Sequence, residues 1–236
     1  MSPDISLALP TYNERDNIIG VLQASVASLD SLKRSWEIVV IDNHSSDDTV
    51  QRVREFIESN DYPVRLIVHD SNRLYSGSCR TAIKEADGKY IAIMDADGQC
   101  NAGDIPRFIE RIEAGADLVF GWRVKRNDPV TRSLISRVFN LLGRLWFGFP
   151  FHDLNCGFRM FDRRFAEIAE IKYEINMSNP ELYVRASNHH LKMDEVEVHH
   201  YERRGGTTSH NLKKLFNIFI DVNRYFAFLR RELASN

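Results

Sequence analysis

Short apolar runs alternate with helical patterns through the first 120 residues, and this alternation constrains the fold more than any other feature of the sequence. The apolar runs lie at residues 5–10, 36–42, 64–69, 90–94 and 117–121. Between the first two, apolar residues recur at helical spacing, at Ile18, Val21, Leu22 and Val26. Repeated strand–helix units build a parallel sheet wound with helices on both faces. The sequence therefore predicts an α/β fold.

The regular alternation fades after residue 121. We expect a helix rich in large apolar residues from about Arg132 to Trp146, a polar link at 152–161, and a helix that begins in SNPELYVRA. Residues 194–201 alternate like a strand, and the chain closes with a long helical pattern. Since no repeat or linker interrupts the sequence, we expect one domain with three parts, at 1–121, 122–210 and 211–236.

Composition excludes several classes of protein. Cys79, Cys100 and Cys156 form no C-x-x-C pair, so neither a disulfide framework nor a zinc knuckle is indicated, and a reduced intracellular compartment is favoured. The N-terminus has no signal-peptide pattern, and no apolar stretch approaches the ~18 residues that span a bilayer. Residues 1–118 carry a net charge of −8 and residues 119–236 carry +6. This asymmetry reflects either solvated helix faces or an acidic half that holds a cation and a basic half that meets an anion.

Polar segments follow three of the predicted strands: PTYNE at 10–14, DNHSSDD at 42–48 and DADGQ at 95–99. In wound parallel sheets, ligands bind beyond the carboxyl ends of the strands, which is where these segments lie. Asp95 and Asp97 are two residues apart and share a face if the strand geometry persists, and Gln99 adds a carbonyl oxygen on that side. Mg²⁺ and Mn²⁺ prefer such hard oxygen ligands together with phosphate. A divalent cation that bridges a diphosphate is therefore favoured here over a solvated turn.

Together, LALPTYNERDNI, IVVIDNHSSDDTV and IAIMDADGQ resemble the nucleotide-binding half of family 2 glycosyltransferases of the GT-A fold. Four further segments are similar to the polyprenyl-phosphate glycosyltransferases, a branch typified by dolichol-phosphate mannose synthase: GWR (121–123), RSLIS (132–136), DLNCGFR (153–159) and YERRGGTTS (201–209). The resemblance implies a GT-A-type, Rossmann-like, mostly parallel sheet. Residues 1–121 would bind nucleotide and metal, 122–210 would face the acceptor, and 211–236 would form an amphipathic helix.

The resemblance also implies roles for individual residues. Pro10, Tyr12 and Glu14 would line the nucleoside pocket, Asp42 would hydrogen-bond the base, and Asp95 would lie near the ribose and the metal. Asp95, Asp97 and Gln99 would hold Mg²⁺ or Mn²⁺. Arg123, Arg132, Ser136, Arg203 and Thr208 would bind phosphate oxygens of donor or acceptor. Among these, Asp97, Arg123 and Arg203 would carry the catalysis, with Asp153 orienting a substrate group or an arginine.

The sequence departs from the family pattern at three places. Asn43 stands where the family often has a second aspartate, and RRGGTTS lacks the lysine that closes the family motif, for which Lys213 or Lys214 would have to substitute. The Gln-x-x-Arg-Trp element of processive synthases is absent, which favours transfer of a single sugar.

The resemblance implies an inverting transfer of one hexose from a nucleotide-diphospho-sugar, GDP-mannose first, to a polyprenyl phosphate. That acceptor is ionised at neutral pH and needs no base, whereas a sugar hydroxyl would need a carboxylate such as Asp153 or Glu181. Two alternatives stay open: the same fold acting on a soluble hydroxyl acceptor, and a non-catalytic nucleotide-sugar-binding subunit. We expect a cytoplasmic protein with no nucleic-acid partner, and peripheral contact with the cytoplasmic face of a membrane or with a membrane subunit.

The two long C-terminal helical patterns admit two interpretations. Residues 132–146 carry a broad apolar stripe beside Arg137 and Arg144, and residues 211–236 repeat the theme with basic pairs at both ends. Such stripes are typical of helices that pack on a core, and interfacial membrane binding is the alternative. The histidine pairs at 189–190 and 199–200 lack the spacing of a metal site, so we expect surface or strand histidines.

Overall fold

A computed structural model describes residues 2–124, 130–201 and 212–234, with only the backbone of residues 130–135, 212–219 and 232–234. Its centre is a sheet in the order β3-β2-β1-β4-β6-β5-β7. The strands are β1 (Ile5–Thr11), β2 (Trp36–Asp42), β3 (Val64–Val68), β4 (Tyr90–Ile93), β5 (Leu118–Arg123), β6 (Arg159–Asp162) and β7 (Met193–Val198). Among the strands of the described residues, β6 alone runs antiparallel to its neighbours, β4 and β5. The predicted wound, mostly parallel sheet is therefore confirmed.

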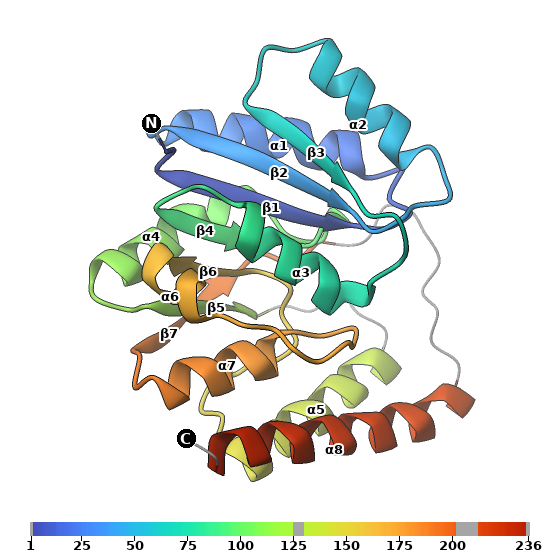
Figure 1. The fold of residues 1–236 in the computed structure, drawn as a ribbon, viewed down its shortest axis with the longest axis vertical. Helices are drawn as coiled ribbons and strands as arrows, with labels where there is room; N and C mark the ends of the chain where they lie inside the picture. Colours follow the sequence, from blue (N-terminus) through green and yellow to red (C-terminus); the bar gives the residue numbers. More distant parts are fainter. Residues whose placement is uncertain (1, 125–129, 202–211, 235–236) are drawn as a thin grey trace.

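Helices cover both faces of this sheet (Figure 1). They are α1 (Ile18–Ser31), α2 (Thr49–Glu58), α3 (Leu74–Glu85), α4 (Ile105–Glu113), α5 (Val130–Phe147), α6 (Arg163–Ile168), α7 (Asn179–Asn188) and α8 (Leu212–Ala234), with a short 3₁₀ turn η1 (Ala102–Asp104) before α4. One core lies between the sheet and α1, α2 and α4. The other core lies between the sheet and α3, α5, α6, α7 and α8. The alternating inward side chains of β1 show why: Leu7 and Leu9 enter the first core and Ala8 the second.

The acceptor-side part departs from the sequence prediction at one strand. Residues 152–161 were expected to form a polar link, yet the segment ends in β6, which inserts between β4 and β5. All four residues of β6 are buried on both faces of the sheet, so its sequence RMFD shows no polar–apolar alternation. A strand that short, beginning with an arginine, carries no periodic signal of its own.

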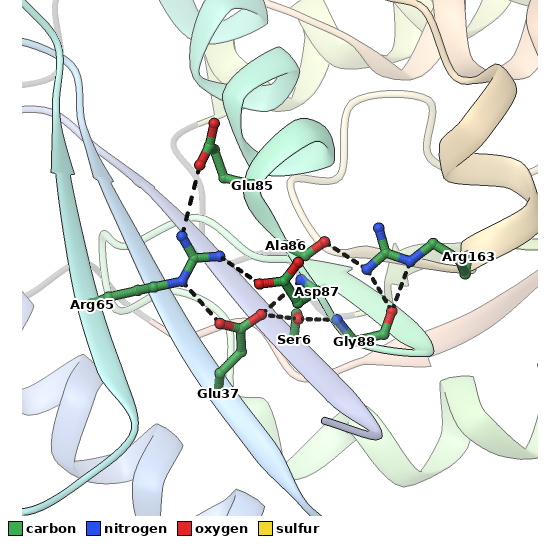
Figure 2. A network of polar contacts seen from close by, with 8 residues as sticks. All are labelled: Ser6, Glu37, Arg65, Glu85, Ala86, Asp87, Gly88 and Arg163. Carbon is green, nitrogen blue, oxygen red and sulfur yellow. Dashed lines mark hydrogen bonds and ion pairs between the residues drawn. The ribbon is translucent and has the colours of Figure 1, made fainter. Parts of the chain in front are cut away.

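A polar network joins the amino ends of three strands to the turn before β4 (Figure 2). The Glu37 carboxylate accepts hydrogen bonds from Ser6 Oγ, from the Asp87 N–H (2.8 Å) and from Arg65 Nε (2.9 Å). The Gly88 N–H donates to Ser6 Oγ at 2.7 Å. These groups pair with one another and stabilise the end of the sheet opposite the predicted site. The polar segments predicted to bind ligands lie at the carboxyl ends of the strands.

Within the described residues, no helix combines the length and the apolarity needed to cross a bilayer.

Candidate functional site

The carboxyl ends of β1, β2 and β4 meet at one edge of the sheet. Thr11 pairs with Asp42 in the parallel register of β1 and β2, and the Asn43 N–H donates to the Thr11 carbonyl at 2.8 Å. The Met94 N–H continues the ladder from β4 to the Ala8 carbonyl at 3.0 Å. The three polar segments singled out in the sequence are thus brought together by strand pairing, as the carboxyl-end rule requires.

Asp42 lies at the base of the first corner. It is fully buried, and its Oδ1 accepts a hydrogen bond from the Ser45 N–H at 2.9 Å. Its Oδ2 is buried with no hydrogen-bond partner among the described residues. An unpaired buried carboxylate oxygen is costly, and such orphans mark places where a ligand donor fits. The predicted role of Asp42 toward a base N–H stays a prediction.

The other residues expected around the nucleoside lie on the chain that leaves β1. Pro10 is buried in the strand, whereas the Tyr12 side chain is 47% exposed and available to a flat ligand. Glu14 is buried, where its carboxylate accepts from Asn17 Nδ2 at 2.7 Å and its N–H donates to Thr49 Oγ1 at 2.9 Å. Glu14 therefore shapes the turn between β1 and α1, and its contact with a nucleoside stays a prediction.

The departure at Asn43 has a structural cause. Its Nδ2 donates to Asn72 Oδ1 and to the Leu74 carbonyl, at 3.0 and 3.2 Å, and its Oδ1 accepts from the Arg73 N–H at 2.9 Å. An aspartate at this position has no N–H to donate. The asparagine amide thus holds the loop that leads into α3.

Asp95 lies two residues beyond β4 and is clamped from two sides. Its Oδ1 accepts a hydrogen bond from the Tyr75 hydroxyl at 2.6 Å. Its Oδ2 faces Gly157, where a Cβ would come within 1.9 Å of it. The Tyr75 hydroxyl in turn accepts from Arg159 Nη1 at 2.9 Å. Sequence reasoning did not identify Tyr75, Gly157 or Arg159 as site residues.

Asp97 and Gln99 form the turn that follows. Asp97 Oδ1 accepts from the Gln99 N–H at 3.0 Å, and Gly98 between them takes a positive φ of 75°. The buried Gln99 side chain donates its amide nitrogen to the Tyr201 carbonyl at 3.3 Å, so its carbonyl oxygen is the end left for another partner. The turn therefore presents carboxylate and amide oxygens.

These oxygens fit a hard divalent cation that takes its remaining ligands from elsewhere. In the described part of the chain, no three His, Cys, Asp or Glu side chains gather closely enough to hold a metal by themselves. Mg²⁺ and Mn²⁺ are ordinarily bound by one or two carboxylates plus phosphate oxygens and water. A hydrogen bond with Cys156, burial, and the charges of Asp95 and Asp97 raise the pKa of the Cys100 thiol well above its usual value. The charges of Asp95 and Asp97 are thus the smaller part of this shift, and it is the two carboxylates themselves that favour a cation.

Arg123, at the end of β5, is bound bidentately by Asp153. Nε and Nη2 lie 2.7 and 3.1 Å from the two carboxylate oxygens, and both side chains are buried. Nη2 also donates to the Asn155 carbonyl at 3.0 Å. Burial alone would lower the pKa of Arg123, but the hydrogen bond and charge of Asp153 raise it above its usual value. Of the two roles expected for Asp153, the structure shows the orientation of an arginine.

The remaining predicted phosphate ligands are only partly described. Arg203 and Thr208 lie outside the described residues, and Arg132 lies in the first turns of α5, where only the backbone is described. Ser136, one turn later, is 3% exposed, and its Oγ has no hydrogen-bond partner among the described residues. Their shared role in binding phosphate stays a prediction.

A pocket of about 300 Å³ opens beside Asp95, and we call it the Asp95 pocket. It is lined by Tyr75, Asp95, Arg159 and residues 154–157 and 176–179. Asn179 Nδ2 donates to the Cys156 carbonyl at 2.7 Å, while its Oδ1 is buried without a hydrogen-bond partner among the described residues. Polar groups from Tyr75, Asp95, Arg159 and Asn179 thus line this pocket next to the acidic turn.

Glu181 and His199 make contacts that hold parts of the fold together. Glu181 is fully buried, and it accepts the N–H groups of Lys172 and Tyr173 at 2.7 and 3.3 Å. Burial raises the pKa of Glu181, and these hydrogen bonds act against that shift. His199 Nδ1 lies 2.7 Å from Asp104 Oδ1, just after β7. Glu181 thus holds the segment before α7, and His199 joins β7 to η1.

Comparison with known proteins supplies the family. Residues 6–168 match the model described as glycosyl transferase family 2. A dodecaprenyl-phosphate galacturonate synthase from Rhizobium johnstonii is 25% identical over 97% of this chain and 68% of its own length. An undecaprenyl-phosphate 4-deoxy-4-formamido-L-arabinose transferase from Pectobacterium carotovorum is 26% identical over 93% and 66%. The chain spans about two thirds of the length of these curated relatives.

Solved structures of the same fold are more distant in sequence. Glucosyl-3-phosphoglycerate synthase from Mycobacterium tuberculosis, in complex with Mn²⁺, UDP and phosphoglyceric acid, superposes with a TM-score of 0.71. It is 15% identical, over 97% of this chain and 78% of that one. A mannosyltransferase from Pyrobaculum calidifontis, in complex with GDP-Man and Mn²⁺, gives a TM-score of 0.63 at 16% identity, over 100% and 74%. These likenesses confirm the fold.

Proposed function

This chain belongs to glycosyl transferase family 2, and from that premise we propose that it transfers a single hexose, with inversion, from a nucleotide-diphospho-sugar to a polyprenyl phosphate. One observation carries the proposal. The orphaned Asp42 oxygen and the oxygens of the Asp95–Gln99 turn lie at the same sheet edge, where the base of a nucleotide sugar needs a hydrogen-bond acceptor and its diphosphate needs a cation.

The proposed site residues act mainly by position and charge. Asp42 accepts a base N–H, and Asp95, Asp97 and Gln99 hold Mg²⁺ or Mn²⁺. When bound, that cation supplies positive charge to the departing diphosphate. Arg123, fixed by Asp153, adds its remaining N–H groups to the same developing charge, where preorganised donors are most effective. Arg203, Arg132, Ser136 and Thr208 are proposed to receive the other phosphate oxygens.

The state of the spare carboxylates favours a phosphate acceptor over a hydroxyl. A hydroxyl nucleophile needs a base within hydrogen-bond reach, whereas a phosphate monoester is already ionised. Asp153 is paired with Arg123, and Glu181 is buried with its oxygens on backbone N–H groups. Both carboxylates are thus held by other groups of the fold. The names of two relatives, a dodecaprenyl-phosphate synthase and an undecaprenyl-phosphate transferase, support the same class of acceptor.

The donor is the least constrained part of the proposal. GDP-mannose is the first candidate, followed by UDP-glucose and UDP-N-acetylhexosamines. The relatives are named for a galacturonate and a formamido-arabinose, and the structural neighbours hold UDP in one case and GDP-Man in the other. A thermal-shift screen of nucleotide sugars with Mn²⁺ selects among them.

We place the reaction at the cytoplasmic face of a membrane, with the chain bound peripherally or through a membrane subunit. A polyprenyl phosphate keeps its hydrocarbon in the bilayer, so the enzyme must come to the surface.

The decisive experiment is transfer itself. The protein is incubated with labelled nucleotide sugars, Mn²⁺ and a short polyprenyl phosphate, and the organic-extractable label is counted. Asp97→Ala removes a proposed metal ligand, so we expect transfer to fall by at least about 100-fold, the scale for losing one group that stabilises the leaving charge. Chelation with EDTA should have the same effect.

The matched control is Asp61→Ala, an exposed aspartate in the turn before β3. It should retain full transfer. Undiminished transfer by Asp97→Ala, or after chelation, would refute the metal role. Label that enters only a water-soluble product would point instead to a hydroxyl acceptor.

A further inference from the structure

Arg159 is a charged side chain in the interior of the fold. It is the first residue of β6 and is only 1% exposed. Among the described residues, it is the largest of the fully buried side chains. A buried guanidinium is costly unless carboxylates and hydrogen bonds compensate it. No carboxylate of the described residues forms an ion pair with it, and its Nε has no hydrogen-bond partner there. A charge kept in this place needs an explanation.

Its contacts lead to Asp95. Arg159 Nη1 donates to the Tyr75 hydroxyl at 2.9 Å, and Nη2 lies 2.7 Å from Cys79 Sγ. The guanidinium carbon is 5.4 Å from the centre of the Tyr75 ring. Tyr75 then reaches Asp95 Oδ1 at 2.6 Å. The positive charge is thus one hydroxyl away from the acidic turn.

The direction of both hydrogen bonds follows from the residue types. An arginine has only donors, so the Tyr75 oxygen must accept from it. The single hydroxyl hydrogen of Tyr75 is then directed to Asp95 Oδ1. Hydrogen bonds in such a series polarise one another, which strengthens the hydrogen bond from Tyr75 to the Asp95 carboxylate.

The chain also decides which oxygen of Asp95 remains. Oδ1 is taken by Tyr75, and Oδ2 lies against Gly157 at the wall of the Asp95 pocket. Tyr75 is itself fixed at the start of α3, where its N–H donates to Asn176 Oδ1 at 3.2 Å. The carboxylate plane is therefore set by groups from α3, from β6 and from the loop before α7.

We propose that Tyr75 and Arg159 are positioning residues that orient Asp95, so that Oδ1 is held by Tyr75 and Oδ2 is left for the cation that binds the donor diphosphate. The inference rests on the proposed function for the role of Asp95, and it assigns two residues that act through Asp95. Partners of this kind typically change metal affinity 10- to 100-fold when they are lost.

The primary test is Tyr75→Phe, which removes one oxygen and keeps the ring. Mn²⁺ is titrated into the protein with saturating GDP or UDP, and free Mn²⁺ is measured by electron paramagnetic resonance. We expect an affinity at least about tenfold weaker than wild type, in a protein that stays folded with a modestly lower melting temperature because Arg159 loses a hydrogen-bond partner. In the transfer assay, the Mn²⁺ concentration for half-maximal rate should rise more than the rate at saturating Mn²⁺ falls.

Tyr62→Phe is the matched control, because it makes the same chemical change on an exposed ring in the loop before β3. Arg159→Met should weaken Mn²⁺ binding in the same direction. The double variant Tyr75→Phe/Arg159→Met should bind Mn²⁺ little more weakly than either single variant, since both changes break the same series of hydrogen bonds. Wild-type Mn²⁺ affinity in Tyr75→Phe would overturn the inference.

A crystal structure separates this inference from the proposed function. If the wild-type protein binds no Mn²⁺ with either nucleotide, the metal role of the site is wrong. The orientation of Asp95 is then read from crystals of Tyr75→Phe. A rotated carboxylate supports the positioning role, and an unmoved one refutes it.

Discussion

At the scale of single residues, the site depends on Gly157 having no side chain. A Cβ on this residue would lie 1.9 Å from Asp95 Oδ2 and 2.2 Å from its Cγ, far inside contact distance. The Asp95 side chain can rotate away from an added Cβ. We therefore expect the fold to tolerate the substitution while the carboxylate moves from its position.

We therefore expect Gly157→Ala to reduce transfer by about 100-fold, the usual effect of a misplacement near 1 Å, with a small change in melting temperature. Initial rates at saturating donor measure it. Gly20→Ala is the control, because a Cβ on Gly20 of α1 meets nothing within 4 Å. That variant should stay fully active and gain up to about 1 kcal/mol of stability from helix propensity. Equal activity of the two variants would contradict the role of Gly157.

At the scale of elements, α5 has two unlike faces. Phe139 is buried against Phe226 of α8, and a Cβ on Gly143 would come within 2.6 Å of Leu154, so this face is tightly packed. On the other face Leu141 and Leu145 are 56% and 71% exposed. The helix contains three arginines and no acidic residue. The packed face bears out the core interpretation, and membrane binding through the other face stays a prediction.

We expect Leu141→Glu/Leu145→Glu to lose binding to anionic vesicles by at least tenfold, because burying a leucine contributes about 2 kcal/mol and each glutamate adds repulsion. Co-sedimentation of the chain with vesicles of phosphatidylcholine and phosphatidylglycerol measures it. Val68→Glu, at a residue 41% exposed on the edge strand β3, is the control. Transfer to a short acceptor in detergent should survive the double change. Wild-type protein that stays in the supernatant would refute a membrane role for α5.

At the scale of the whole molecule, the two ends of the sheet carry different charge chemistry. The carboxyl ends hold the site, and the amino ends hold the Glu37 network (Figure 2). Burial alone would raise the pKa of Glu37, but hydrogen bonds from Ser6, the Asp87 N–H and Arg65 lower it below its usual value. The ionised carboxylate therefore stabilises the fold above the unfolded pKa of about 4.3, and this contribution is lost as the pH falls through the lower folded value.

Glu37→Gln should accordingly lower the free energy of unfolding by about 1.5–3 kcal/mol at pH 7, the range for hydrogen bonds to a charged group. The difference from wild type should shrink as the pH falls below about 4. Urea unfolding at several pH values measures both. Glu58→Gln, an exposed glutamate at the end of α2, is the control and should change little. A stability difference that is independent of pH would show that shape, not charge, is what Glu37 supplies.

The order and kind of most elements, and with them one corner of the candidate site, could be predicted from the residue pattern alone. Five apolar runs gave β1 to β5, because burial on both faces of a parallel sheet is written locally in each strand. Parallel strands align their carboxyl ends, so the order of the strands was enough to bring Asp42 and the Asp95–Gln99 turn together. The missed strand β6 is too short and too uniformly buried for such a pattern.

The contacts between buried polar side chains, by contrast, depend on how distant segments pack in three dimensions. Tyr75 and Arg159 are 84 residues apart, and Arg123 and Asp153 are 30 apart. Periodicity reports whether a side chain faces core or water, and nothing in it records which distant group a buried hydroxyl or guanidinium will meet. Those partners are fixed only when β6 enters the sheet between β4 and β5 and carries Gly157 and Arg159 under the acidic turn.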